Sequence, residues 1–293
     1  MQNTFNIRPL SKLMAAEVTG LDLGKKLDAA TFKAVNQAFL DHMVLVFRDQ
    51  SLTKAQQVAF SEQFGDLEEH RARNRGADEF PLVHVQSNLD PDGKPSGKLN
   101  STAWHTDKSF RPAPARATIL HAVVLPSAGG DTCFANMAAA YDALSDDEKA
   151  SLEGVRVVHS WPLSRENVGK EISEEETRAN PPMSHWLVST QPETGRKSLF
   201  LGVHAAYLED AEFEAGRDRI LALEAHATQE QFVYRHKWRV GDLLMWDNRC
   251  LLHRADANFS VDKVARVMHR TCLVGIPTSG QRIAREAVYA AKF

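Results

Sequence analysis

The chain has 293 residues, of which 43% are hydrophobic and 25% are charged, and its formal net charge is −3. This composition is typical of a globular protein with a sizeable core, and the charge excludes a strongly basic nucleic-acid surface. The N-terminus lacks the apolar stretch of a signal peptide, and no segment approaches about 18 continuous apolar residues, which would indicate a membrane span. We therefore expect a cytoplasmic protein with no membrane or nucleic-acid partner, and its length allows one large β-rich domain or two ordinary ones.

The three cysteines, Cys133, Cys250 and Cys272, are odd in number and widely spaced. A disulfide framework pairs its cysteines, and a zinc ribbon places them close together in the sequence. Neither is expected here.

The predicted elements begin with a small α/β portion. A helix near residues 30–40 precedes a strand at 43–47, and a second helix follows near 54–64. The second helix has a start signal in Ser51, with Thr53 also available as its N-cap.

Two long polar stretches are the next features of the chain. Residues 68–97 are expected to form mostly loop around a strand at 82–86 and to be one side of an active-site lid, because loops of that length commonly carry function. Residues 162–182 are charged and predicted to be irregular, either disordered without ligand or a solvated surface insertion. Further strands are predicted at 117–124, on both sides of a turn at 192–195, and at 233–239, 243–247 and 266–274; further helices are predicted at 137–143, from Ser145, and at 210–227.

The first chemical signal is a pair of possible metal ligands two residues apart, His105 and Asp107. On an extended strand, side chains at i and i+2 leave the same face, so both can converge on one ion if the backbone is β there. His253 would supply a third ligand from a different strand. Two imidazoles and one carboxylate leave three octahedral positions open, which is typical of non-haem Fe(II) oxygenases. Taken alone, the motif also occurs by chance in a chain with 12 histidines.

A pair of arginines strengthens the metal hypothesis. Arg266 and Arg270 are separated by an even number of residues, so on a strand both guanidinium groups point to one side. Guanidinium binds carboxylate bidentately and stays charged, so the pair indicates organic acids as cosubstrate and substrate. The structural alternative is an internal ion pair with Asp or Glu.

The chain as a whole resembles the taurine dioxygenase and dichlorophenoxyacetate dioxygenase family of Fe(II)- and 2-oxoglutarate-dependent enzymes. The similarity covers nearly the whole chain in order, which is far more specific than a three-residue motif and favours a single catalytic domain over residues 1–293. The matching segments are residues 7–10, 16–23, 44–50, 64–67, 104–107, 129–132, 195–199, 246–253 and 266–270.

The resemblance assigns roles to individual residues. It implies iron ligation by His105, Asp107 and His253, with 2-oxoglutarate chelating the metal and O2 entering an open position. The distal carboxylate of 2-oxoglutarate would meet Arg266 and the hydroxyl of Thr132, a charged donor beside a neutral one. Without the resemblance, Thr132 is an ordinary polar residue of a glycine-containing turn.

Three positions in the sequence are matched to substrate binding by the same resemblance. Arg270 would face the substrate's acidic group and the metal-bound end of 2-oxoglutarate. His70 would help to hold the substrate anion, although by itself it is a histidine in a charged loop. Ser101 stands where the taurine enzyme has an asparagine, and Arg73 where it has a tyrosine, and these departures count against taurine. The neighbouring Asn100 could restore the asparagine if the loop is shifted.

The resemblance favours the aryloxyalkanoate branch of the family. The product of hydroxylation would be released together with succinate and CO2, and a taurine-like sulfonate is the alternative substrate. An aromatic or bulky carboxylate would fit an apolar pocket, although aromatic residues are more often core residues. The candidate pocket residues are Phe110, Trp161, Met183, His185 and Trp186.

The expected fold is α/β with a mostly β core, a double-stranded β-helix or jelly roll with surrounding helices and long active-site loops. Such a fold pairs early with late strands and would bring His253 to His105. We expect a small organic acid as substrate and a homo-oligomer as the assembly. A zinc hydrolase and a ligand-binding jelly roll without activity remain the alternatives from other classes.

Overall fold

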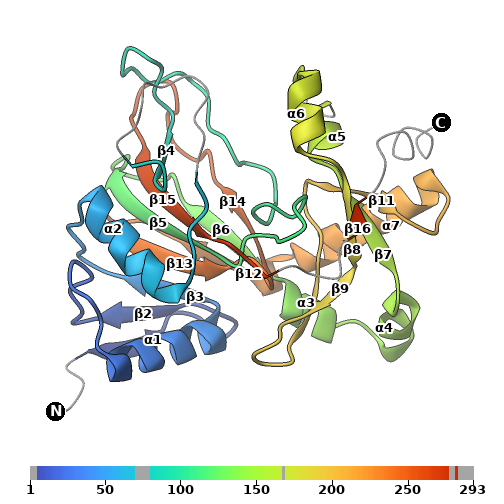
Figure 1. The fold of residues 1–293 in the computed structure, drawn as a ribbon, viewed down its shortest axis with the longest axis horizontal. Helices are drawn as coiled ribbons and strands as arrows, with labels where there is room; N and C mark the ends of the chain where they lie inside the picture. Colours follow the sequence, from blue (N-terminus) through green and yellow to red (C-terminus); the bar gives the residue numbers. More distant parts are fainter. Residues whose placement is uncertain (1–4, 70–79, 167–168, 277–280, 283–293) are drawn as a thin grey trace.

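The computed structural model describes residues 5–69, 80–166, 169–276 and 281–282 of the chain. Its architecture is mixed α/β around a large sheet, as Figure 1 shows. The seven strands of this sheet lie in the order β1-β2-β3-β13-β5-β15-β4, and only the β2 and β3 pair is parallel. They are β1 (Asn6–Pro9), β2 (Ala16–Thr19), β3 (Val44–Phe47), β4 (His84–Ser87), β5 (Ala117–Val124), β13 (Leu243–Asp247) and β15 (Val267–Leu273).

A smaller sheet packs against one face of the large one. It contains β12 (Val233–His236), β6 (Thr132–Asn136) and β14 (Leu251–Ala255) in that order. Because side chains alternate along a strand, Leu244 and Trp246 of β13 point toward this sheet, where they join Phe134 and Leu251 in one buried cluster. Burying a side chain of this size stabilises the fold by about 1.5–3 kcal/mol. The two sheets therefore face each other across a shared core.

Two helices cover the opposite face of the large sheet, α1 (Ala29–His42) and α2 (Lys54–Ser61), and a short 3-10 turn, η1 (Glu62–Phe64), continues α2. Phe39 of α1 and Phe60 of α2 pack against Met245 of β13 in a second cluster. The start of α2 follows from its sequence, because Thr53 and Gln56 form a capping box.

The rest of the chain builds the other end of the molecule (Figure 1). A four-stranded sheet has the order β11-β7-β8-β16, and β9 pairs with β10 as a hairpin. The strands are β7 (Arg156–His159), β8 (Met183–Trp186), β9 (Val188–Thr190), β10 (Lys197–Leu199), β11 (Ala205–Leu208) and β16 (Gln281–Arg282); the helices are α3 (Met137–Asp142), α4 (Asp146–Leu152), α7 (Phe213–Ala227) and the 3-10 turn η2 (Glu230–Phe232).

The charged stretch 162–182 differs from the prediction of irregular structure. Its described residues contain part of α5 (Trp161–Glu166) and all of α6 (Glu174–Ala179). Ser173 and Glu176 form a capping box at the start of α6. These local hydrogen bonds stabilise a helix in a segment whose many charges had indicated irregular structure. Within the described part of the chain, no helix is long and apolar enough to cross a membrane.

Candidate metal centre

Three buried side chains that can bind a metal meet between the two facing sheets. The candidate ligand atoms of His105, Asp107 and His253 all lie within 4.8 Å of one another. Two backbone hydrogen bonds join the histidines, since the His105 amide donates to the His253 carbonyl at 3.0 Å and the reverse bond measures 2.8 Å. The late strand β14 therefore delivers His253 directly opposite His105.

The backbone is not an extended strand at both His105 and Asp107, so the condition under which strand geometry would bring these side chains together is not met. His105 makes only an isolated bridge to β14, and Asp107 begins a turn in which Lys108 has a φ of 60°. The two side chains converge because the chain turns at Asp107, and the hydroxyl of Thr106 anchors that turn by donating to the carbonyl of Asn248 at 2.6 Å.

The carboxylate of Asp107 is held by two side chains from the large sheet. Thr118 of β5 donates its hydroxyl to Oδ2 at 2.6 Å, and Arg270 of β15 donates to Oδ1 at 3.2 Å. Burial opposes the charged form, but the Arg270 guanidinium and the two imidazoles outweigh it and hold the pKa of Asp107 well below its usual value. The carboxylate is therefore ionised and fixed in orientation, as a metal ligand must be.

The two imidazoles are neutral, and this state suits them for metal binding. Burial lowers the pKa of both His105 and His253. Nδ1 of His105 lies 2.9 Å from the carbonyl of Ala103, so Nδ1 carries the proton and Nε2 keeps its lone pair. Nε2 of His253 lies 3.7 Å from Oδ2 of Asp107. Neutral nitrogen donors beside an ionised carboxylate fit a divalent transition metal.

Asn248 links the metal centre to its supports, and the sequence reasoning gave it no role. Its Oδ1 accepts hydrogen bonds from Trp246 and from the amide of Asp107, and its Nδ2 donates to Thr118 at 2.9 Å. Asn248 and Thr118 are therefore a connected pair beneath Asp107. The signal available in the sequence was an amide side chain in the short turn between two apolar strands.

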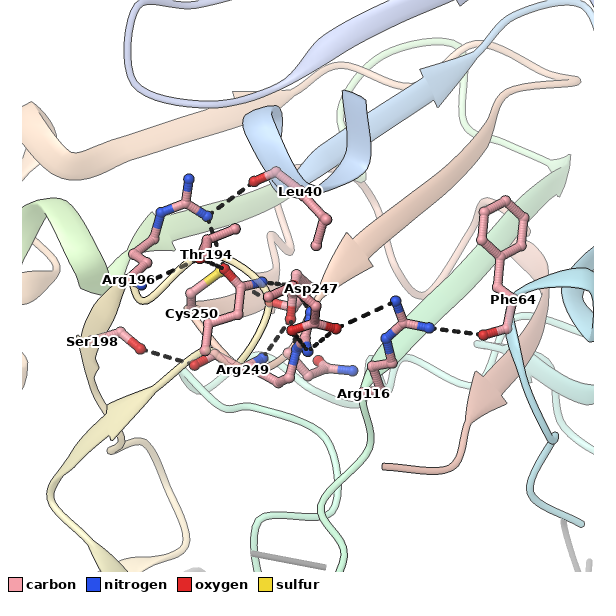
Figure 2. Close-up of polar contacts among 12 residues, drawn as sticks. Leu40, Phe64, Arg116, Thr194, Arg196, Ser198, Asp247, Arg249 and Cys250 are labelled. Atoms are coloured by element: carbon pink, nitrogen blue, oxygen red, sulfur yellow. Dashed lines mark hydrogen bonds and ion pairs between the residues drawn. The ribbon is translucent and has the colours of Figure 1, made fainter. Parts of the chain in front are cut away.

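A second polar network fixes the turn that leads into β14, and Figure 2 shows it. Asp247 is fully buried and accepts from the backbone and side chain of Arg249 and from Gln191. Arg249 also donates to both carboxylate oxygens of Glu193, and its carbonyl accepts from Ser198. The β9–β10 hairpin thereby holds the turn from which His253 departs.

The three candidate ligands line a cavity of about 860 Å³. Of the five candidate pocket residues, Phe110 and Trp161 line the cavity, whereas Met183, His185 and Trp186 do not. Other sequence-predicted residues on its wall are Ser101, Thr132, Arg266 and Arg270. His70 and Arg73 lie outside the described residues.

Arg266 and Thr132 form a polar corner in this cavity. Arg266 is 4% exposed, and its Nε donates to the carbonyl of Gly130 at 3.1 Å. Burial lowers its pKa to about 10, with Asp131 opposing the change, so the guanidinium is still charged at neutral pH. The Thr132 hydroxyl accepts from Trp238 at 2.9 Å, which leaves its own proton free to be donated. Both groups are therefore hydrogen-bond donors on the cavity wall.

Arg270 has a different environment. Besides Asp107, its guanidinium contacts Nδ1 of His84 at 2.9 Å. The structural alternative considered from the sequence, an internal ion pair, therefore describes part of what Arg270 does. Its contact with the substrate stays a prediction.

Facing sheets that bury two imidazoles and a carboxylate at a cavity that also contains a buried arginine are typical of the class of non-haem iron oxygenases. Residues 6–272 match the family described as taurine catabolism dioxygenase TauD, TfdA family. The chain belongs to this family, as the motifs in its sequence had indicated.

Individual relatives are similar over most of their length. The alpha-ketoglutarate-dependent 2,4-dichlorophenoxyacetate dioxygenase of Cupriavidus pinatubonensis is 42% identical over 84% of this chain and 90% of its own. The (S)-phenoxypropionate/alpha-ketoglutarate-dioxygenase of Sphingobium herbicidovorans is 36% identical over 97% and 100%. The crystal structure of AAD-2 with Mn(II) and N-oxalylglycine has a TM-score of 0.85 and 38% identity, covering 96% of this chain and 100% of AAD-2.

Proposed function

We propose that the protein is an Fe(II)- and 2-oxoglutarate-dependent dioxygenase that hydroxylates an organic acid of the aryloxyalkanoate type, with release of succinate and CO2. The observation that carries this proposal is the buried cluster of His105, Asp107 and His253 in a cavity shared with Arg266. The names of the relatives at 36–42% identity support the same reaction and substrate class.

The residues of the chain have separate tasks in this reaction. His105, Asp107 and His253 would hold the metal, and Arg266 with Thr132 would bind the distal carboxylate of 2-oxoglutarate. When bound, iron and 2-oxoglutarate supply the oxidising chemistry by activating O2. The fixed carboxylate of Asp107 keeps the ligand set in one geometry.

The same site supports a carboxylate substrate next to the metal. Arg270 and Ser101 lie on the cavity wall, where the family resemblance places groups that contact the substrate. We infer that these two residues and His70 contribute to substrate binding. A sulfonate substrate is the alternative within the family.

We further infer that the two facing sheets form a double-stranded β-helix and that residues 1–293 are one catalytic domain. The mutual bridge between His105 and His253 supports the fold, because it joins an early segment to a late strand across the interior. The core shared by both sheets supports the single domain. The cytoplasmic location and the homo-oligomer stay predictions.

The test of this function is coupled product formation. The purified protein with Fe(II), 2-oxoglutarate and O2 is assayed for succinate with aryloxyacetates, aryloxypropionates, arylacetates and alkylsulfonates. We expect succinate release that depends on both iron and an aryloxyalkanoate. Zn(II)-supported turnover without 2-oxoglutarate would indicate a hydrolase, and a preference for alkylsulfonates would reassign the substrate. An absence of succinate with every acid would contradict the proposal.

A further inference from the structure

The charged side chains of the cavity wall are not all paired. Two of the cations have carboxylate partners: Arg270 donates to Asp107, and Lys108 lies 3.5 Å from Glu68. The full set of Asp, Glu, Lys and Arg residues on the wall, among the described residues, is Asp107, Lys108, Arg165, Lys170, Arg266 and Arg270. Arg165, Lys170 and Arg266 therefore remain without a carboxylate at ion-pair distance in the described part of the chain.

The proposed reaction brings more carboxylates into the cavity than Arg266 alone can bind. 2-Oxoglutarate carries two carboxylates, of which one chelates the metal and the other would meet Arg266. An organic-acid substrate brings a further carboxylate into the same cavity. A cation other than Arg266 is therefore needed to neutralise it.

Arg165 has the geometry of an anion-binding group. It lies near the end of α5, and its guanidinium carbon is 5.5 Å from the centre of the Trp161 ring. Its Nε is buried and has no hydrogen-bond partner, and no side-chain hydrogen bond of Arg165 occurs among the described residues. A buried donor without a partner is unfavourable, so an incoming carboxylate would satisfy an N–H that the protein leaves unpaired.

Lys170 is the other unpaired cation on this part of the wall, and it is less suited. Its side chain is exposed, so its ammonium group stays hydrated and loses more solvation when an anion binds. The guanidinium of Arg165 is planar, partly desolvated and positioned by its ring contact, which favours bidentate carboxylate binding.

The surroundings of Arg165 match an acid with an aromatic part. Trp161 packs near Phe110 with ring centres 6.3 Å apart, and both rings line the cavity. Phe110 in turn contacts the ring of His204 edge-on at 4.9 Å. A cation beside this aromatic wall can bind a carboxylate while the rings contact the apolar remainder of the same molecule.

We propose that Arg165 binds the carboxylate of the organic-acid substrate and that Trp161 and Phe110 contact its apolar part. This assignment rests on the proposed function and deepens it, because it makes α5 the element that selects for an anionic substrate. A neutral analogue of the same shape would lose the contact with Arg165 but keep the contacts with the two rings.

The experiment measures binding separately from turnover. The protein is loaded with Mn(II) and N-oxalylglycine, and 2,4-dichlorophenoxyacetate or its neutral amide is titrated by calorimetry. We expect Arg165→Gln to weaken binding of the acid roughly 10- to 100-fold, the range for losing a charge-assisted hydrogen bond, and to leave binding of the amide unchanged. Arg178→Gln, which removes an exposed arginine from the neighbouring α6, is the matched control and should change neither.

Three results would overturn the assignment of Arg165. The first is that Arg165→Gln binds the acid as tightly as the wild type does. The second is that Arg165→Gln weakens binding of the acid and of the amide equally. The third is that Lys170→Gln, and not Arg165→Gln, weakens binding of the acid. Succinate assays of the iron enzyme with the same acids separate this from the proposed function. If the wild type releases succinate and the Arg165→Gln variant has the same KM for the acid, only the inference about Arg165 is rejected. If the wild type releases no succinate with any acid, the proposed function is rejected and the inference with it.

Discussion

Replacing Thr118 by valine tests how the metal ligand Asp107 is positioned. The two side chains have nearly the same shape, but valine cannot donate to Oδ2 of Asp107 or accept from Nδ2 of Asn248. Thr118 is fully buried, so water cannot replace either hydrogen bond. The substitution therefore leaves one support of the carboxylate, Arg270, and frees it to rotate.

The expected magnitudes follow from these contacts. Loss of a hydrogen bond to a charged group costs about 1.5–3 kcal/mol, and the unpaired amide of Asn248 adds to this, so the free energy of unfolding should fall by about 2–4 kcal/mol. Removing a group that orients a metal ligand weakens metal binding about 10- to 100-fold, which corresponds to about 1.4–2.7 kcal/mol.

Calorimetric titration of Mn(II) into the metal-free protein measures the second effect, and urea unfolding measures the first. Thr118→Ser is the matched control, because it keeps the hydroxyl and loses one buried methyl group, at a cost of about 1 kcal/mol in stability. The serine variant should bind Mn(II) like the wild type. Equal affinity in the wild type and the valine variant, or equal losses in the valine and serine variants, would refute the role of this hydroxyl.

Three further predictions concern carboxylates and the cations that meet them. Arg266→Ala should raise the KM for 2-oxoglutarate roughly 100-fold in succinate assays while the protein stays folded, because a charged donor is removed; an unchanged KM would contradict the clamp. Asp107→Ala should abolish succinate formation and keep the far-UV circular dichroism spectrum, and measurable turnover would exclude Asp107 as a ligand. The third concerns Asp242: burial opposes its charge, yet hydrogen bonds from His236, the amide of Arg239 and Arg48 lower its pKa. A carboxylate with a lowered pKa stabilises the folded protein above the unfolded pKa of about 4, and this stabilisation is lost as the pH falls further. The free energy of unfolding should therefore decrease less steeply with falling pH in Asp242→Asn than in the wild type; equal slopes would refute this.

Long apolar segments were the most predictable part of the fold. β5 and β13 begin and end where the sequence indicated, because each is a mostly apolar run that is buried on both faces of the sheet, except for the last two residues of β5. The start of α4 was also predictable, since Ser145 and Glu148 form a capping box through contacts only three residues apart.

Short strands could not be predicted in the same way. β7 and β8 have four residues each and mix charged, polar and apolar side chains, and their pairing depends on segments far away in the sequence. A strand of this length is marginal by itself and forms only when tertiary pairing supplies its hydrogen bonds. The bridge between His105 and His253 is the extreme case, because one residue on each side defines it.

The ligands of the candidate metal centre were recognisable from residue type, whereas their supports were not. A histidine or aspartate in a short motif suggests chemistry, but Thr118 lies within an apolar strand and has the β-branched shape that strands favour. Its function appears only when β5 is placed beside the turn at Asp107. Positioning residues are therefore the part of a site that depends most on the three-dimensional structure.

The spacing of Arg266 and Arg270 in the sequence does not predict the chemical role of each arginine. Both Arg266 and Arg270 line the cavity, but Arg266 precedes β15 and the strand register shifts between Val267 and Met268, so even spacing on one strand does not explain it. The chemical surroundings of the two arginines also differ. The Arg270 guanidinium donates to Asp107, which places its charge on the metal ligand, whereas the Arg266 guanidinium donates only to a backbone carbonyl among the described residues. A cation that is already paired with a carboxylate within the protein attracts a second anion less strongly. The substrate carboxylate should therefore depend less on Arg270 than on a cation without a carboxylate partner, and on the described wall near the aromatic rings that cation is Arg165.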